Sequence, residues 1–339
     1  MTDIVVVILN YKTPDLAVVA AQSAAAALAG FGGAIVLVDN DSPDDSFQTM
    51  QTLVRDIDWP SRLEVQVLQS GRNGGYGAGN NFGIQAGLQI CPSAEFVYVL
   101  NPDAQAEIGA IAALVAYLNT HPDVAIAGSW VYGEDGEDHC SAFRFPGLAS
   151  EFESSIRLGL ITRLLKKYVL PLHVPEVSGP VGWILGASML VRTRALSEIG
   201  LFDETFFLYF EETDLCLRAH RAGYGVHFVR ESRVCHIGSV STGMGTWSRT
   251  PTYWYQSRWY YFSKNHSHAY AITATVLNVI GTSLWRLRRL IEGKPITGAK
   301  HFLRDMILHD LRALLRPTPN ATIRPIGRSA DTSLQTSVD

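Results

Sequence analysis

Short apolar runs alternate with longer helical stretches along the first half of the chain. Runs of strand length lie at 4–9, 34–38, 63–68, 95–100 and 124–127. The segments between them predict helices at about 14–29, 43–56, 77–90 and 107–119. This alternation is typical of an α/β fold, in which a mostly parallel central sheet is flanked by helices.

The second half of the chain has a weaker pattern, with loops predicted around 133–147. The regular elements expected there are a helix near 150–168, a strand at 186–192, a helix from Glu211 that ends before Gly223, and a strand at 226–229. The last dozen residues are rich in Ser and Thr. Because such a composition cannot build a packed core, we expect a disordered tail.

Composition narrows the classes of function. The 339 residues can form one large α/β domain with a C-terminal appendage, or two domains. A formal net charge of −4 disfavours a general nucleic-acid-binding protein. The four cysteines contain no Cys-x-x-Cys pair, which argues against a structural zinc site, a redox motif or a disulfide framework. The first residues lack the basic region of a secretory signal, so the cytoplasm is the expected compartment.

An uncharged stretch at 269–285 leads directly into a basic segment. The basic residues of that segment are Arg286, Arg288, Arg289, Lys294, Lys300, Arg304, Arg312, Arg316, Arg324 and Arg328. The stretch is shorter than the roughly 20 apolar residues that a membrane-spanning helix needs, and polar residues interrupt it. Two interpretations remain: an amphipathic helix at an anionic membrane surface, on the inner face of the plasma membrane, or a helix packed on the rest of the protein.

Polar residues follow the first two predicted strands. Asp39 ends the second strand, and Asn10 and Tyr11 end the first. Ligands of open α/β sheets bind at the carboxyl ends of the strands. There Asp39 can accept the imide N–H of a uracil or thymine ring, Asn40 helps to shape the turn, and the Tyr11 ring can stack on the base. The alternative is a turn rich in Asp, Asn and Ser that only caps the next helix.

A stretch rich in glycine and asparagine runs from Asn73 to Gly83 at the start of a predicted helix. Glycine allows a ligand to approach the backbone closely, and amides at a helix start favour anionic groups. A dinucleotide-binding motif would instead need its glycines after the first strand, where the sequence reads Asn10-Tyr11-Lys12-Thr13. The sequence therefore argues against a hydride-transfer enzyme.

Asn101-Pro102-Asp103 follows the strand predicted at 95–100. A carboxylate at this position can reach a divalent cation that bridges the phosphates of a nucleotide sugar, and carboxylate oxygens suit Mg²⁺ or Mn²⁺. Asn101 is neutral and offers a carbonyl oxygen or a hydrogen bond. An Asn-Pro-Asp turn that caps the following helix is the alternative.

Glu211, Glu212 and Asp214 concentrate carboxylates directly after an aromatic run at 206–210. Close like charges in a partly apolar setting raise the pKa of one carboxyl group, which suits a general base. The alternative is an acidic first turn of a helix, where acids complement the helix dipole. His236 follows another strand-like segment, but a single histidine is usually structural.

In this order, the motifs resemble those of glycosyltransferase family 2, the inverting enzymes with a GT-A (Rossmann-like) fold, and within it the bacterial rhamnosyltransferase-like branch. The resemblance extends from Ile4 to about Lys264. The division of the chain that we expect is a catalytic domain at 1–264, with a nucleotide-binding half at about 1–128 and an acceptor half at about 129–264, a C-terminal helical region at 265–318 and a disordered tail at 319–339.

The resemblance implies that Asp39 contacts the pyrimidine base and that the Asn73–Asn81 loop lies near the nucleotide and sugar. The residues assigned to the donor are Asn10, Tyr11, Asp39, Asn40, Asn73, Gly75, Tyr76, Asn80, Asn81, Asn101 and Arg258. Arg258, in a basic and aromatic segment, would help to hold the diphosphate. Its sequence context lacks the Gln-x-x-Arg-Trp spacing of processive synthases, which argues against a processive polymerase.

The resemblance also assigns the chemistry. Asp103 stands at the metal-binding Asp-x-Asp of the family, and His236 matches a histidine that completes the shell of Mg²⁺ or Mn²⁺. Glu212 stands where the second acid of a Glu-Asp pair is the catalytic base. The residues assigned to the acceptor are Trp183, Gly186, Ala187, Glu211 and Asp214.

The implied activity is inverting transfer of a sugar, rhamnose or another hexose, from a dTDP- or UDP-linked donor to a hydroxyl group. The acceptor would be a glycan or a lipid-linked acceptor in the synthesis of a cell-surface polysaccharide. The resemblance alone favours dTDP-rhamnose. The alternative is a non-catalytic protein that binds sugar nucleotides, which the missing acid at Asn101 would favour.

Overall fold

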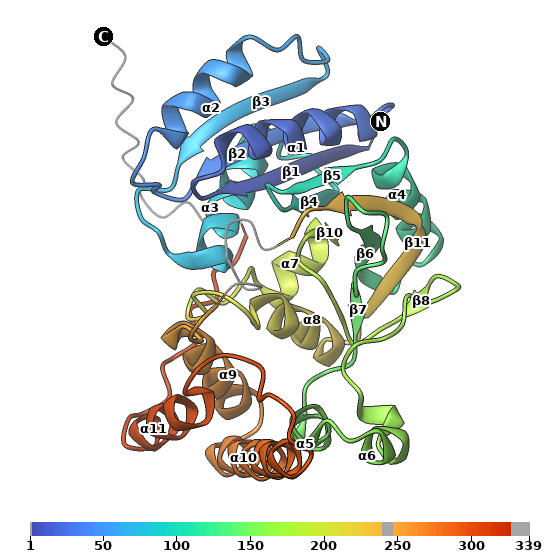
Figure 1. Cartoon of the computed structure of the whole chain (residues 1–339). Coiled ribbons are helices and arrows are strands. Elements are labelled where there is room, and N and C mark those ends of the chain that lie inside the picture. Colours follow the sequence, from blue (N-terminus) through green and yellow to red (C-terminus); the bar gives the residue numbers. More distant parts are fainter. Residues whose placement is uncertain (1, 239–246, 327–339) are drawn as a thin grey trace.

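The apolar runs of the sequence form one mixed central sheet (Figure 1). The computed structural model describes residues 2–238 and 247–326. Every strand predicted for the first half of the chain is present. The strands follow one another across the sheet in the order β3 (Leu63–Gln69), β2 (Gly32–Asp39), β1 (Asp3–Asn10), β4 (Phe96–Leu100), β10 (Ser188–Arg192), β6 (Val124–Tyr132), β11 (Gly225–His236) and β5 (Ala104–Ala106).

The strands β3, β2, β1 and β4 run parallel to one another. Asn10 pairs with Asp39 in this register, and Ile8 pairs with Leu100. The carboxyl ends of β2, β1 and β4 therefore meet at one edge of the sheet. The polar residues that follow these strands lie side by side there, as ligand sites of open α/β sheets require.

Antiparallel strands make the sheet mixed. β10 is antiparallel to both of its neighbours, β4 and β6, while β5 and the short β8 (Gly179–Pro180) are antiparallel to β11. In the pairing of β5 with β11, Ala104 lies opposite His236. This register brings Asp103, the residue before Ala104, next to His236, although the two are far apart in the sequence.

Helices cover both faces of the sheet. On one face, apolar residues of the strands pack with α1 (Pro14–Ala27), α2 (Ser46–Arg55) and α4 (Ala110–Thr120). On the other face they pack with α3 (Gly75–Ile90), α7 (Thr193–Ile199) and α8 (Glu211–Arg221). The buried strands have apolar residues directed to both faces, which is why their sequences are continuous apolar runs rather than alternating ones.

The helix predicted near 150–168 is divided in two. α5 (Leu148–Ile156) ends at Arg157, which has a left-handed backbone (φ 48°), and α6 (Gly159–Leu164) and a short 3-10 helix (Lys166–Tyr168) follow. The Arg157 guanidinium lies over the Trp285 ring of α10 (His268–Ile291), 4.4 Å from the ring centroid. Local helix propensity does not indicate this tertiary contact. The prediction of one helix was therefore wrong.

The end of the molecule away from the sheet is helical (Figure 1). α9 (Thr252–Asn265), α10 and α11 (Phe302–Leu314) pack there around a separate apolar cluster that includes Phe206 and Trp259. Within the described residues, we find no helix with both the length and the apolar character needed to cross a membrane.

Residues 319–326, which we predicted to lie in a disordered tail, pack on the loop before α8. The Leu201 amide donates to the Arg324 carbonyl oxygen (2.9 Å), and the Glu204 amide donates to the Thr322 carbonyl oxygen (3.0 Å). Asp203 and Ile323 form an isolated β-bridge. The prediction was therefore wrong for this segment; the rest of the predicted tail lies outside the described residues.

Candidate active site

Asp39 is buried at the carboxyl end of β2. Its Oδ1 accepts a hydrogen bond from Asn10 Nδ2 (2.9 Å), and its Oδ2 accepts one from the Ser42 amide (3.0 Å). Lys12 and Asp41, in the turns that follow β1 and β2, have left-handed backbones (φ 63° and 57°). Strained backbone of this kind is concentrated at functional sites. A partly exposed Tyr11 precedes Lys12 at this edge.

Asn40 fastens the loop before α3 to this edge. Its Nδ2 donates to Asn73 Oδ1 (3.1 Å) and to the Gly75 carbonyl oxygen (3.3 Å). Asn73 Oδ1 also accepts the Gly75 amide (3.1 Å). The predicted donor residues Asn40, Asn73 and Gly75 thus form one hydrogen-bonded unit beside Asp39.

The metal ligands predicted from the sequence are in contact. His236 Nε2 lies 3.1 Å from Asp103 Oδ1 and 3.4 Å from Asn101 Nδ2; Asp103 and His236 are buried, and Asn101 is partly buried. Asn101 Oδ1 is buried and has no hydrogen-bond partner among the described residues. The described part of the chain contains no group of three or more His, Cys, Asp or Glu side chains that could hold a metal ion.

Glu211 and Glu212 open α8 at the same side of the molecule. Tyr209 and Phe210, directly before them, both have left-handed backbones (φ 70° and 71°). One carboxylate oxygen of each glutamate is buried and has no hydrogen-bond partner among the described residues. Burial, with the charge of Glu212 adding to it, raises the pKa of Glu211 well above its usual value. Burial also raises the pKa of Glu212 to about 7.

Tyr76 joins these parts into one site. Its hydroxyl donates to the Gly186 carbonyl oxygen (2.7 Å). Burial raises the pKa of Tyr76 well above its ordinary value, and the nearby carboxylates of Glu212, Glu211 and Asp103 raise it further. The charges of these three carboxylates therefore all act on the same buried hydroxyl group.

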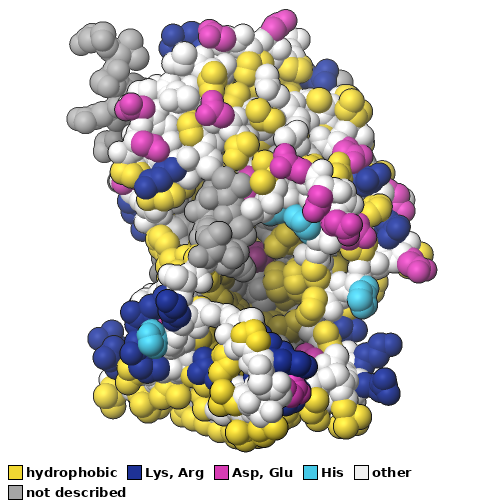
Figure 2. All heavy atoms as spheres, in the orientation of Figure 1, with side chains coloured by type: hydrophobic (Ala, Val, Ile, Leu, Met, Phe, Trp, Pro, Cys, Tyr) yellow, Lys and Arg dark blue, Asp and Glu magenta, His cyan; other side chains and the backbone are white. Residues whose placement is uncertain are grey.

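The segment predicted to face the acceptor lies beside Tyr76. Trp183, in β9 (Trp183–Ile184), stacks on Phe143 of β7 (Ala142–Phe143) with 4.0 Å between ring centroids, and it is partly exposed. Ala187 is buried, and its carbonyl oxygen accepts the Asn101 amide (3.0 Å). This segment therefore contacts Tyr76 through Gly186 and Asn101 through Ala187. Figure 2 shows the surface hollowed between the sheet and the helical end.

Comparison with known proteins identifies the family. The family model described as Glycosyl transferase family 2 matches residues 6–179, and the one described as Glycosyl transferase family group 2 matches residues 160–315. An N-acetylglucosaminyl-diphospho-decaprenol L-rhamnosyltransferase of Mycobacterium tuberculosis is 30% identical over 245 residues, which cover 69% of this chain and 75% of that protein. The chain belongs to glycosyltransferase family 2.

Other relatives agree with this family. The rhamnosyltransferase WbbL of Escherichia coli is 27% identical over 212 residues, covering 59% of this chain and 76% of that protein. Among solved structures, a mannosyltransferase of Pyrobaculum calidifontis in complex with GDP-Man and Mn²⁺ superposes with a TM-score of 0.53 at 12% identity, covering 92% of this chain and 79% of that one. The fold is thus GT-A, and the chain is a glycosyltransferase of the rhamnosyltransferase-like branch.

The glycines of α3 have a different purpose in this glycosyltransferase from the one that we predicted. A Cβ on Gly79 or Gly83 would lie within 2.5 Å of the side chain of Leu9 or Val7, so these glycines allow α3 to pack closely on β1. At Gly75 (φ 87°), a Cβ would lie 1.9 Å from the Phe207 carbonyl oxygen. The glycines serve packing rather than approach of a ligand.

The asparagines of α3 are also occupied by the protein. Asn81 Nδ2 donates to the Phe202 carbonyl oxygen (2.9 Å), and Asn81 Oδ1 accepts the Phe202 amide (3.0 Å), so the predicted donor contact of Asn81 is wrong. Asn80 Nδ2 donates to the Tyr76 carbonyl oxygen (3.0 Å). Its Oδ1 is buried without a partner among the described residues, so Asn80 remains a candidate.

Arg258 does not lie at the donor site. Its side chain is 1% exposed and forms ion pairs with Glu151 Oε2 (2.7 Å) and Asp310 Oδ2 (3.5 Å). It joins α9 to α5 and α11 inside the helical end. The prediction that Arg258 holds the diphosphate was wrong because its basic and aromatic neighbourhood is a buried helix interface.

Asp214 does not contact an acceptor either. It is fully buried and pairs with Lys264 Nζ (2.8 Å) and Arg218 Nε (2.9 Å). Lys264 also pairs with Asp203 Oδ2 (2.8 Å). The prediction for Asp214 was therefore wrong. These paired charges fix α8, and hence Glu212, against α9, a role for Lys264 and Asp203 that no local sequence signal revealed.

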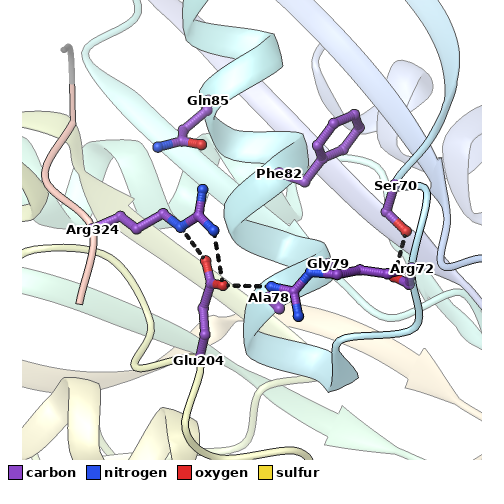
Figure 3. A pocket seen from close by; sticks show the side chains of 8 residues that line it. All are labelled: Ser70, Arg72, Ala78, Gly79, Phe82, Gln85, Glu204 and Arg324. Atoms are coloured by element: carbon purple, nitrogen blue, oxygen red, sulfur yellow. Dashed lines mark hydrogen bonds and ion pairs between the residues drawn. The ribbon is translucent and has the colours of Figure 1, made fainter. Parts of the chain in front are cut away.

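A small cavity lies behind α3, away from these carboxylates. Figure 3 shows Glu204 between Arg72 and Arg324, with nitrogen–oxygen distances of 2.8 Å to each. The cavity volume of about 130 Å³ is well below the roughly 300–1,000 Å³ of small-molecule sites. Its ion pairs tie the 319–326 segment to the loop before α3, so this cavity is a structural junction.

Proposed function

We propose that this glycosyltransferase moves a hexose, with rhamnose favoured, from a dTDP- or UDP-linked donor to a hydroxyl group of a lipid-linked glycan acceptor, with inversion. The observation that supports the proposal most is that Asp103, paired with His236, follows a strand whose carboxyl end lies at the same edge of the sheet as Asp39, while the charges of Asp103 and Glu212 both act on Tyr76. The names of the rhamnosyltransferase relatives support the choice of sugar, and that of the mycobacterial relative supports a lipid-linked acceptor.

At the donor end of the site, Asp39 would recognise the pyrimidine base of the nucleotide. A carboxylate accepts the imide N–H that uracil and thymine share, and the hydrogen bond from Asn10 holds that carboxylate in place. Tyr11, partly exposed beside it, is free to stack on the base. Because uracil and thymine share this N–H, this end of the site does not distinguish dTDP from UDP.

Asp103 and His236 would hold a divalent metal ion. Carboxylate oxygen and imidazole nitrogen suit Mn²⁺, and the 3.1 Å between Asp103 Oδ1 and His236 Nε2 resembles the spacing of neighbouring ligands on one octahedral ion. The unpartnered Asn101 Oδ1 supports a polar ligand at the same place. The ion, when bound, would offset the negative charge that develops on the leaving diphosphate.

Glu212 would be the general base. Its carboxylate takes the proton of the acceptor hydroxyl while that oxygen attacks the anomeric carbon and the bond to the nucleoside diphosphate breaks. The raised pKa supports this role, because a base with a pKa near the working pH transfers protons most effectively. Burial and the charge of Glu212 also raise the pKa of Glu211 well above its usual value, which favours its neutral form.

A donor screen tests the proposed function. The full chain is incubated with Mn²⁺ and dTDP-rhamnose, UDP-N-acetylglucosamine or GDP-mannose, with and without a polyprenyl-diphosphate-linked N-acetylglucosamine, and release of nucleoside diphosphate is measured. We expect acceptor-dependent release from a pyrimidine nucleotide sugar. Tight nucleotide binding with no release from any donor would favour the alternative, a non-catalytic protein that binds sugar nucleotides.

The pH profile of turnover follows from Glu212. Because only the ionised form accepts a proton, and burial raises the pKa of Glu212 to about 7, kcat should rise with pH and reach half of its plateau near pH 7. Glu211 and Glu212 are neighbours, so the profile reports apparent values of the pair. An ordinary glutamate would give half of the plateau near its unshifted pKa of about 4.3, and a flat profile between pH 5 and 8 would contradict the assignment.

We further propose that the helical end lies on an anionic membrane surface. Exposed apolar residues recur along one stripe of α10, at Ile272, Val276, Ile280, Leu284, Leu287 and Ile291. Figure 2 shows hydrophobic side chains along this end of the molecule, with Lys and Arg on either side of it. An apolar stripe with flanking basic residues suits the boundary between anionic headgroups and hydrocarbon.

Substitutions in the stripe test this contact. Leu284→Asp combined with Leu287→Asp should weaken binding to vesicles that contain phosphatidylglycerol by about tenfold or more, since apolar contact is lost and the anionic lipid repels the added carboxylates. Vesicle flotation measures the bound fraction. The matched control is Val19→Asp with Ile108→Asp, two exposed apolar residues outside the helical end. Equal flotation of the two double variants would contradict the proposal.

A further inference from the structure

A second, larger groove lies in the helical end between α9 and α11. Its volume is about 910 Å³, within the usual range for small-molecule sites. The walls come from Thr252–Tyr260 of α9, from Arg304–Ala313 of α11 and from the segment 316–319. None of its lining residues belongs to the Asp39, Asp103 or Glu212 site. The groove is therefore a separate feature of the molecule.

Arginines dominate the charge of this groove. Arg249, Arg304, Arg312 and Arg316 line it, opposed by the carboxylate of Asp305. Arg304, Arg312 and Arg316 are separated by multiples of four residues, so they follow one side of α11 and its extension. The groove thus carries a clear excess of positive charge.

Of these four arginines, Arg312 and Arg316 are available to a ligand. Arg249 and Arg304 both pair with Asp305, at 2.6 Å and 3.1 Å. Arg312 and Arg316 are exposed, and neither side chain has a hydrogen bond or an ion pair within the described residues. Two unpaired guanidinium groups on one groove wall suit a phosphate, whose oxygens accept paired N–H bonds.

The groove also has an apolar side. The rings of Tyr255, Trp259 and Tyr260 form its buried floor. Leu308, exposed in its wall, lies on the same helix as the exposed Leu311 and Leu314. The basic groove therefore opens beside apolar surface at the end of the molecule that we assign to the membrane. A ligand that fits both parts has a phosphate and a hydrocarbon chain.

We propose that this groove binds the phosphate headgroup of an anionic membrane lipid, with Arg312 and Arg316 on the phosphate and Leu308 beside the hydrocarbon chain. Binding there would add a specific contact to the general attraction of the apolar stripe. It would hold this end of the protein in one orientation on the bilayer. The proposal does not depend on the identity of the donor sugar, because the two sites share no residue.

Calorimetric titration of the full chain with dihexanoylphosphatidic acid, below its micelle concentration, tests the groove. We expect one molecule to bind, and Arg312→Gln with Arg316→Gln should weaken it by about tenfold or more, since two charge-assisted contacts are lost. The control is Arg163→Gln with Lys166→Gln, which removes two exposed charges of the same sign elsewhere in the helical end and should leave affinity unchanged. Thermal unfolding of both variants checks that they remain folded.

Three results would overturn the proposal. The first is the absence of binding heat for the native chain, and the second is an equal loss of affinity in the control variant. The third is equally tight binding of inorganic phosphate, which would make the groove a site for free phosphate. Without membranes, the Arg312→Gln, Arg316→Gln variant should release nucleoside diphosphate at the native rate. A failure of the lipid-binding proposal can therefore be distinguished from a failure of the proposed sugar transfer.

Discussion

Replacement of Glu212 by glutamine is expected to slow sugar transfer by about 10²–10⁴-fold, the usual contribution of a well-placed general base. Glutamine has the shape of glutamate but cannot take the proton of the acceptor hydroxyl. The nucleotide contacts that we propose lie at Asp39 and Asp103, on other elements, so the affinity for dTDP or UDP should change by less than about threefold. Turnover under saturating donor and calorimetric titration of the nucleotide measure the two effects.

Glu211→Gln is the matched control for this variant. Burial, with the charge of Glu212, raises the pKa of Glu211 well above its usual value and so favours its neutral form, and a neutral carboxylic acid resembles the glutamine amide in size and hydrogen bonding. Turnover should therefore fall by less than about tenfold. If Glu211→Gln lost most of the activity and Glu212→Gln kept it, the base would be Glu211.

Replacement of Asp103 by asparagine has the second largest expected effect. The variant keeps the size of the side chain but removes the only carboxylate that contacts His236 in the described structure. We expect turnover to fall by more than about 100-fold, because charge on the leaving diphosphate is no longer offset. Nucleotide affinity should also lose its dependence on Mn²⁺.

Titration of the protein with dTDP, once with Mn²⁺ present and once with EDTA, measures how nucleotide affinity depends on the metal. The native chain should bind dTDP more tightly with Mn²⁺, and Asp103→Asn should bind it equally under both conditions. Asp123→Asn, which removes an exposed carboxylate after α4, serves as the control and should behave as the native chain. Native affinity that does not respond to Mn²⁺ would contradict the assignment of Asp103 and His236.

The parallel half of the fold could be predicted because short stretches of the local sequence indicate its strands and helices. The strands of residues 1–128 follow from apolar runs and the helices from the segments between them, and their order forces Asp39 and Asp103 to the same edge of the sheet. The pairing of Asp103 with His236 was suggested only by resemblance to the family. Its physical cause, the antiparallel register of β5 and β11, joins residues that are far apart in sequence.

The wrong predictions share a physical origin. Arg258 and Asp214 have the residue types and neighbours of a ligand site, but each is neutralised by buried partners on other helices. The glycines of α3 look like a ligand-binding loop, but Leu9 and Val7 occupy the space that a Cβ would need. A charge or a glycine reveals its role only when its tertiary neighbours are known, and those neighbours are not encoded in the local sequence.

A crystal structure of the complex with dTDP and Mn²⁺ tests the central claim most directly. The account predicts the thymine against Asp39, the ion between the diphosphate and the Asp103–His236 pair, and the Glu212 carboxylate facing the space beyond the second phosphate. A nucleotide bound elsewhere, or a Glu212 carboxylate too far away for a sugar attached to that phosphate to reach, would contradict it.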